Sequence, residues 1–210
     1  MVRRGFYLFS MLSGPVTYYD VQKVFGIQNG EVPQRRSLEY AIDELGIRKG
    51  KDFHRALADA IYTAKVLQTL DMEKVFVYSS VDVYQNPKKR KEEIFLSYPE
   101  YDQYIFREFV DKDRIMKDRE VTSTRCPICH FPAKRKLRWF LNNSKAYESL
   151  SLCQKHGWVH GKIRIYHTED EKYYPVKTLK NVDEKAAEEL REKRESLRLK
   201  KQVKRQSEKI

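Results

Sequence analysis

The chain has 210 residues, of which 40% are hydrophobic, so it can bury one modest core or two small ones. Its 42 Lys and Arg against 30 Asp and Glu give a formal charge of +12. Such an excess of positive charge attracts phosphate backbones, anionic lipids or acidic proteins. Lys-rich helices that only solvate a surface have the same composition. The apolar run at residues 6–12 is short and broken by Ser10, and no long apolar span follows, which favours a soluble protein with no membrane partner.

Helical patterns dominate the N-terminal part of the chain. Residues 16–25 mix apolar and aromatic side chains ahead of a turn-rich stretch, which indicates a short helix. Ser37 is a favourable N-cap for a helix over residues 37–45, and Gly46 suits its C-terminal exit. A further helix is predicted over residues 55–70, with one apolar stripe made of Leu57, Ala60, Ile61, Ala64 and Leu67.

The composition changes between residues 70 and 90, where we place a domain boundary. Residues 75–84 alternate branched and aromatic side chains as strands do, and residues 104–110 are again strand-like, so residues 73–119 are expected to form a β-rich connecting region. From Asp183 onward the sequence is rich in Glu, Lys, Arg, Leu and Ala and has no Gly or Pro. This predicts a basic C-terminal helix over residues 181–210, with too few apolar positions to form a core of its own.

A metal-ligand pattern follows the connecting region. Cys126 and Cys129 are separated by two residues, as are Cys153 and His156, and Gly157 then relieves the tight backbone. These are the only three cysteines, an odd number that suits thiolate ligands better than a disulfide framework and points to a reducing, cytoplasmic location. We predict that the four side chains bind one structural Zn²⁺, which holds a fold together and activates no water.

Other histidines lie near this pattern, at His130, His160 and His167. His160 is the main alternative to His156 as fourth ligand, and the spacing favours His156. Residues 120–167 resemble a zinc ribbon, an arrangement of two knuckles on β-hairpins that is frequent in nucleic-acid-handling proteins. The resemblance implies a small β-rich domain, which we place at residues 120–180.

The segment between the two ligand pairs combines basic and aromatic side chains. Such a mixture contacts phosphates and stacks on bases, so DNA or RNA is the expected partner. The alternative is that Trp139 and Phe140 form the small core beneath the zinc ion. The candidate nucleic-acid-binding residues are Lys134, Arg135, Lys136, Arg138 and Trp139.

Residues 35–68 read RRSLEYAIDELGIRKGKDFHRALADAIYTAKVLQ and contain a His-x-x-x-x-Asp motif formed by His54 and Asp59. Because five residues turn a helix by about 140°, these side chains share a site only if His54 precedes the helix. The segment resembles the last part of a DEDDh-type 3′-5′ exonuclease domain of the ribonuclease-H-like fold. The resemblance implies that His54 is the general base and that Asp59 helps to hold two catalytic Mg²⁺ or Mn²⁺ ions.

The same family needs an Asp-x-Glu pair and a further Asp upstream of this motif. The first nineteen residues contain no Asp or Glu. Asp20 is the earliest candidate, but its surroundings resemble the segment that follows the family's second motif more than the motif itself. Residues 1–72 are therefore expected to be a partial exonuclease domain. Without those carboxylates the two metal ions cannot be clamped. We expect this chain alone to be inactive or weakly active unless a separate chain supplies the missing half.

The sequence thus predicts an α+β protein: a mainly helical, truncated ribonuclease-H-like remnant, a small β-rich zinc ribbon and a charged C-terminal helix. Three alternative functions are compatible with these features. The chain is part of a metal-dependent exonuclease, or a zinc-dependent module that binds nucleic acid or a nucleoprotein without cutting it, or it docks on an acidic protein through its basic tail.

Overall fold

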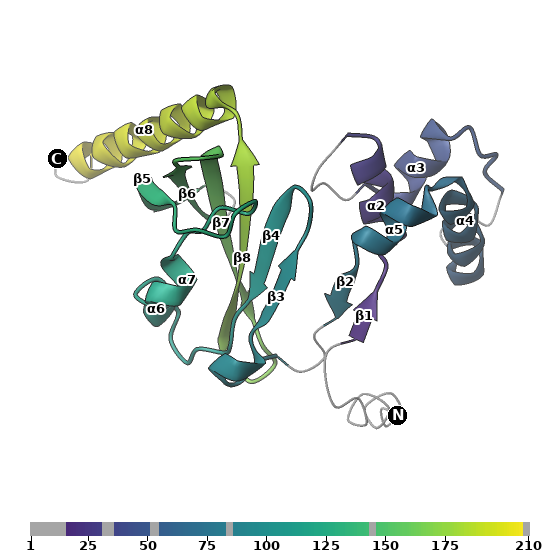
Figure 1. Cartoon of the computed structure of the whole chain (residues 1–210), viewed down its shortest axis with the longest axis horizontal. Helices are drawn as coiled ribbons and strands as arrows, with labels where there is room; N and C mark the ends of the chain where they lie inside the picture. The colour runs from purple at the N-terminus through teal and green to yellow at the C-terminus, as the bar shows by residue number, and fades with distance from the viewer. Residues whose placement is uncertain (1–15, 31–35, 51–54, 83–85, 143–145, 208–210) are drawn as a thin grey trace. The chain divides into compact units, whose positions relative to one another are not determined.

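A computed structural model describes residues 16–30, 36–50, 55–82, 86–142 and 146–207. The fold is α+β, and its chain divides into two compact units, Met1–Gln85 and Asn86–Ile210, which we call unit 1 and unit 2 (Figure 1). Strands on both sides of residue 120 belong to unit 2, so the segments expected at 73–119 and 120–180 contribute to one sheet. The apolar run at residues 6–12 lies outside the described residues.

Unit 1 is helical, with a short antiparallel ribbon in which Val16 pairs with Asp82. Its elements are β1 (Val16–Tyr18), α2 (Val21–Gln28), α3 (Leu38–Glu44), α4 (Ala56–Thr69), α5 (Met72–Val77) and β2 (Ser80–Asp82). As predicted, Ser37 caps α3, where its side chain accepts a hydrogen bond from the backbone N–H of Tyr40 at 3.1 Å. Asp20 caps α2 in the same way.

Two expectations for unit 1 need correction. The alternating pattern at residues 75–84 does not form one strand, because Asp71 caps a helix through the backbone N–H of Glu73 and α5 continues to Val77 before the short β2 begins. The helix predicted at residues 55–70 is present as α4, but it buries Tyr62 and Val66, whereas most of the expected apolar stripe is exposed.

Unit 2 is built on a six-stranded antiparallel sheet with the order β3-β4-β8-β7-β6-β5. Its elements are a 3-10 turn (Arg90–Glu92), β3 (Ile94–Ser97), β4 (Tyr101–Ile105), α6 (Lys112–Ile115), α7 (Arg119–Thr122), β5 (Lys134–Leu141), β6 (Ala146–Cys153), β7 (Gly157–His167), β8 (Tyr173–Val182) and α8 (Glu184–Ser207). The strand expected at residues 104–110 is only partly correct, because β4 ends at Ile105 and the remaining residues of that segment lie outside the strands of the sheet. The charged helix expected at the C-terminus is α8.

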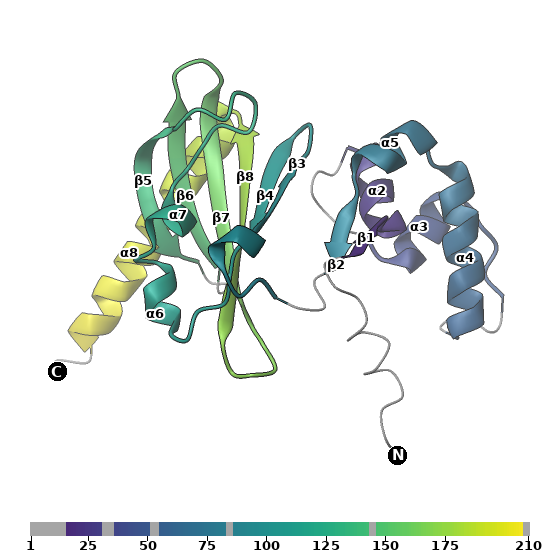
Figure 2. The same ribbon diagram turned by 60° about the horizontal axis from the view of Figure 1, so that its bottom comes forward.

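Helices cover both faces of this sheet, with α6 and α7 on one side and α8 on the other (Figure 2). On the first side, Ile115 of α6 and Val121 of α7 pack against Ile163 of β7. On the second side, Ala187 and Leu190 of α8 pack against a cluster on β5 and β6. We call these sides the α7 face and the α8 face. Side chains generally alternate between the two faces along a strand, but irregularities in the β5–β6 pairing interrupt this alternation in β5, where Leu137 lies on the α8 face and Trp139 on the α7 face.

Candidate metal centre

Four potential metal ligands meet where the chain enters β5 and where β6 turns into β7. Cys126 and Cys129 lie in the loop before β5, Cys153 ends β6, and His156 lies in the turn before β7. The ligand atoms of the four side chains all lie within 4.8 Å of one another. The structure therefore brings together the residues that the spacing singled out, although Cys129 and Cys153 are 24 positions apart in the sequence.

The distances between these ligand atoms fit a tetrahedral zinc ion. With Zn–S bonds of about 2.3 Å and Zn–N bonds of about 2.0 to 2.1 Å, a tetrahedron places two sulfurs about 3.8 Å apart and a sulfur and a nitrogen about 3.6 Å apart. The Sγ atoms of Cys129 and Cys153 are 3.8 Å apart. Nδ1 of His156 is 3.4 Å from Sγ of Cys126 and 3.8 Å from Sγ of Cys153. The group can hold a metal ion such as zinc.

Local backbone geometry shapes both pairs of ligands. In the first pair, the backbone N–H of His130 donates to the carbonyl of Cys126 at 2.8 Å, and His130 has a φ of 55°, in the left-handed region. In the second pair, Cys153 and Gly157 are opposite each other in the β6–β7 ladder, and Gly157 has a φ of 77°. Glycine is favoured at Gly157 because a side chain is strained in that conformation.

The surroundings of the thiols favour a thiolate at Cys153. Burial alone would raise the pKa of Cys153, but the backbone N–H groups of Lys155 and His156 point at its sulfur and lower the pKa to about 6. Burial raises the pKa of Cys126. Zinc binds thiolates, so a bound ion supplies the positive charge that also keeps this buried thiol ionised.

The other histidines near the pattern lie outside the cluster. The Nδ1 of His130 is 3.3 Å from the carboxylate of Asp102, which is fully buried and also accepts a hydrogen bond from Ser97 at 2.8 Å. His160 lies on β7, where burial lowers its pKa to about 4, and His167 packs against the ring of Tyr173 at 4.5 Å. His156 is therefore the histidine that the structure places beside the cysteines.

Two polar residues that we did not single out from the sequence support the knuckles. Asn181 of β8 donates a hydrogen bond from Nδ2 to the carbonyl of His156 at 3.0 Å. Asp102 of β4 holds His130, the neighbour of Cys129. Asp102 carries a weak sequence signal, since a carboxylate inside a strand with aromatic and apolar neighbours needs a partner when it is buried, whereas Asn181 carries none.

The basic segment after Cys129 forms β5, the edge strand of the sheet. The side chains of Lys134, Lys136 and Arg138 are exposed and have no hydrogen-bond or ion-pair partner among the described residues. Arg135 is exposed as well, but its guanidinium donates to the carbonyl of Thr122 at 2.7 Å. The sheet register places Lys134 opposite Leu152, the neighbour of Cys153, so this cationic edge begins beside the metal cluster.

Trp139 is held inside unit 2 on the α7 face. Its Nε1 donates to the carbonyl of Thr122 at 2.9 Å, and its ring packs against the core formed by Ile115, Val121 and Ile163. A Cβ atom on Gly161 would lie 2.7 Å from this ring, so Gly161 leaves the space that the indole occupies. These contacts position the ring for packing rather than for stacking on a base.

Asp59 lies half-buried in the first turn of α4, and His54 lies outside the described residues. Within the described part of the chain, Asp59 belongs to no group of three or more potential metal ligands.

Comparison with known proteins identifies no relative of this chain. No family model, curated protein or solved structure matches this chain. Across the described residues, no helix is both long and apolar enough to pass through a lipid bilayer.

Proposed function

We propose that unit 2 is a zinc-stabilised module that binds DNA or RNA along the cationic edge of β5. The observation that supports this most directly is the trio Lys134, Lys136 and Arg138, three exposed cations without ion-pair partners among the described residues on one edge strand. Phosphate groups are the natural partners of such a row. The first ligand pair lies in the loop before β5, and the second begins at Cys153, the last residue of β6, so a bound zinc ion ties both strands of this hairpin together.

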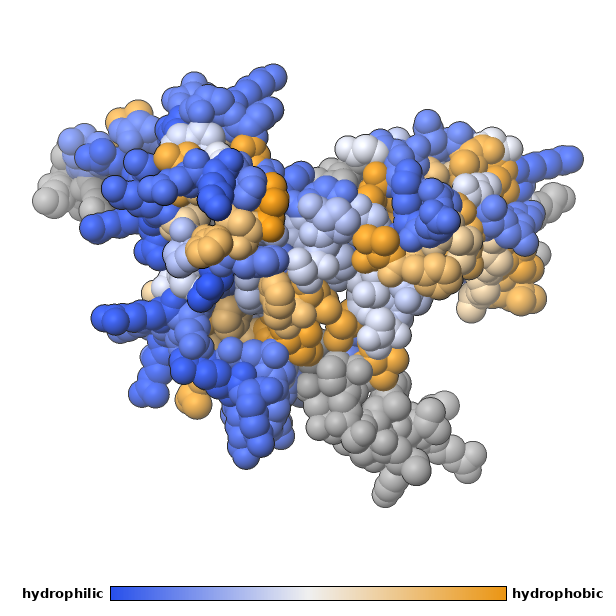
Figure 3. Space-filling view, viewed as in Figure 1, coloured by the Kyte–Doolittle hydropathy of each residue, from blue (hydrophilic) through white to orange (hydrophobic). Residues whose placement is uncertain are grey.

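A second explanation for charged side chains on an edge strand is protection against pairing with other chains. Protection predicts no ligand for these side chains. The hydrophilic surface over α8, which lies near the other end of β5, favours an extended polar interface (Figure 3). Binding measurements separate the two explanations.

The test is the salt dependence of binding. We expect the zinc-loaded chain to bind labelled single-stranded DNA or RNA with an affinity that falls as KCl rises. Replacing Lys134, Lys136 and Arg138 by Ala should flatten the log–log slope by about 2, since each phosphate contact contributes about 0.7 in single strands. Fluorescence anisotropy at several salt concentrations measures both quantities.

A control variant with the same change in charge replaces Lys112, Arg114 and Lys117, which lie on or just after α6 and are exposed. This control variant should keep most of the slope of log affinity against log salt concentration. Equal losses in the two variants would mean that net charge alone governs binding and would contradict an interface on β5. Replacing Cys126 and Cys129 by Ser should abolish binding together with the fold of unit 2.

A second proposal concerns unit 1, which we infer to descend from a 3′-5′ exonuclease domain of the ribonuclease-H-like fold. The support is the sequence motif of His54 and Asp59. Two-metal hydrolysis needs more carboxylates around Asp59 than the described residues provide, so a partner chain would have to bring them along with Mg²⁺ or Mn²⁺. Leu57 and Ile61, one turn apart on α4, are 75% and 48% exposed and offer such a chain an apolar contact.

Cleavage of 3′-labelled single strands in Mn²⁺ tests this second proposal. If a complete site forms, His54→Ala and Asp59→Asn should each abolish cleavage while binding by unit 2 persists. Retardation of the oligonucleotide without any cleavage would show that this chain acts as a binder.

A further inference from the structure

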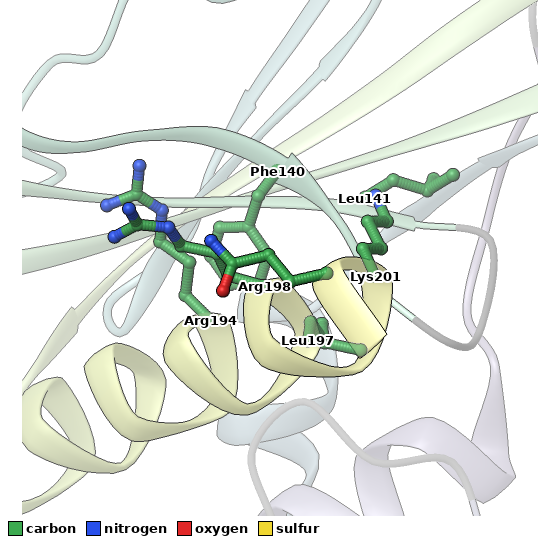
Figure 4. A pocket seen from close by; sticks show the side chains of 7 residues that line it. Phe140, Leu141, Arg194, Leu197, Arg198 and Lys201 are labelled. Carbon is green, nitrogen blue, oxygen red and sulfur yellow. The ribbon is translucent and has the colours of Figure 1, made fainter. Parts of the chain in front are cut away.

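A pocket of about 310 Å³ lies between the end of β5 and the C-terminal half of α8 (Figure 4). Its apolar side chains are Phe140 and Leu141 of β5 and Leu197 of α8. The polar residues that line it all belong to α8, and they are Arg194, Arg198, Lys201 and Gln202. The pocket therefore has an apolar wall on the sheet and a cationic rim on the helix.

The rim is strongly positive. No acidic residue lines the pocket among the described residues, and Arg194 and Lys201 have no ion-pair partner there. Arg198 lies 3.7 Å from Glu195 on the same helix, an exposed pair that solvent screens. Three cations around an apolar wall suit a ligand that is itself part anionic and part flat and apolar.

The size of the pocket restricts this ligand further. Its volume is at the lower end of the range of about 300 to 1,000 Å³ found for small-molecule sites. Such a volume admits one nucleotide, whereas a duplex keeps its base faces stacked and presents none to a side chain. Phe140 is half-buried, and its ring packs on the cluster that joins β5 and β6 to α8, so its position is fixed.

We propose that this pocket binds one unstacked nucleotide of a single strand, with the base against Phe140 and its phosphates at Arg194, Arg198 and Lys201. The inference rests on the proposed function, because the pocket lies at the end of the strand that carries Lys134, Lys136 and Arg138. It adds a specificity: the cationic edge attracts any nucleic acid, and the pocket selects single strands.

The first experiment replaces Phe140 in the full, zinc-loaded chain. Phe140→Leu keeps an apolar side chain in the packing and removes the ring, whereas Phe140→Tyr keeps the ring. We expect Phe140→Leu to weaken binding of a single-stranded oligonucleotide by about 5- to 150-fold, the range for loss of one stacked base. Affinity for a duplex of the same length should stay unchanged, and Phe140→Tyr should behave as the wild type.

The result separates the two proposals. If the wild type binds neither single strands nor duplex, the proposed function fails and the pocket proposal fails with it. If the wild type binds and Phe140→Leu lowers single-strand and duplex affinity equally or not at all, the pocket proposal is overturned and binding along β5 stands. Circular dichroism of each variant establishes that the fold is retained.

A second experiment addresses the rim and tests acidic protein as the occupant. Arg194→Gln with Lys201→Gln should reduce single-strand affinity more than Lys112→Gln with Lys117→Gln, an exposed pair near α6 that loses the same charge. Polyglutamate should compete poorly against the oligonucleotide. Competition by polyglutamate that matches an oligonucleotide of equal charge, and that Phe140→Leu leaves unchanged, would overturn a nucleotide pocket in favour of an acidic peptide.

Discussion

Among the described cations of unit 2, Lys177 is the most buried, and it lies on the α7 face of β8, where it is only 2% exposed. Its ammonium donates hydrogen bonds of 2.9 Å to the carbonyls of Glu120 and Ser123, where α7 ends. The rings of Tyr104 and Phe106 lie 4.6 and 4.9 Å away. Lys177 therefore ties the helix that precedes the metal cluster to the centre of the sheet.

This position makes the stability of unit 2 depend on pH. Burial, and then the charge of Arg125, lower the pKa of Lys177 from 10.5 to about 7. Between these two values the unfolded chain binds more protons at this group than the folded chain does, so the free energy of unfolding should rise with pH. We expect this rise from pH 7 to pH 9 in urea titrations with excess zinc.

The control is Lys177→Met, which keeps the aliphatic stem and removes the titrating group. The difference between wild type and variant cancels the contributions of other groups, including the thiols. Its slope should approach about 1.4 kcal/mol per pH unit at most. Parallel curves for the two proteins would contradict a lowered pKa at Lys177.

At the scale of elements, α8 depends on the sheet for its stability. Its first half is anchored by Ala187 and Leu190 in the core and by the indole N–H of Trp158, which donates to Glu184. Arg191 lies 4.5 Å above the ring of Trp158. These contacts stabilise a helix whose own sequence has few apolar positions. They also place its second half over the end of β5.

Lys193 adds a charged anchor, because its ammonium donates to Glu148 of β6 at 2.8 Å. Burial alone would raise the pKa of Glu148, but the hydrogen bonds from Lys193 and Asn142 lower it below its usual 4.5. Such a carboxylate stabilises the fold at neutral pH, and this contribution is lost as the pH falls through its folded pKa.

Lys193→Met should reduce the free energy of unfolding by about 1 to 3 kcal/mol at pH 7, because it leaves a buried carboxylate without its charged partner. The part of the acid-induced loss of stability that comes from Glu148 should also become smaller, because the variant lacks the partner that lowers the pKa of this carboxylate. Lys185→Met, at an exposed position on the same helix, is the matched control and should change little. Equal effects of the two substitutions in thermal unfolding would rule out this role for Lys193.

At the scale of the whole molecule, the candidate metal centre belongs entirely to unit 2. Zinc should therefore stabilise one unit and leave the other unchanged. Four ligands from two distant segments replace contacts that a small sheet core cannot supply, and removal of a structural zinc ion commonly unfolds such a domain.

We expect chelation of zinc to remove hydrogen-exchange protection from β5 to β8 while α2 to α5 stay protected. Mass spectrometry of peptides from each unit, with and without a chelator, makes this measurement. Readdition of Zn²⁺ should restore protection, and Mg²⁺ should not, because thiolates are poor ligands for magnesium. Loss of protection in both units at the same chelator concentration would contradict their independence.

The sequence by itself identified the features that depend on near neighbours in the chain. The cap of α3 at Ser37, the extent of α4, the presence of α8 and the paired spacings of the four candidate ligands are local, so periodicity, composition and spacing were sufficient for them. Local reading was insufficient at residues 75–84, where the cap at Asp71 outweighed an alternating pattern.

Only the tertiary structure decided which side chains are available for function. Tyr101 of β4 pairs with Lys180 of β8, a contact across most of unit 2 that no local pattern encodes. Such long-range pairing packed Trp139 against the core beneath α7 and left Phe140 beside α8, and in unit 1 the packing of the helices left most of the apolar stripe of α4 exposed. The residue types of a site can be read from spacing, but the face on which each side chain lies is set by packing between distant segments, because those contacts determine which surfaces are buried.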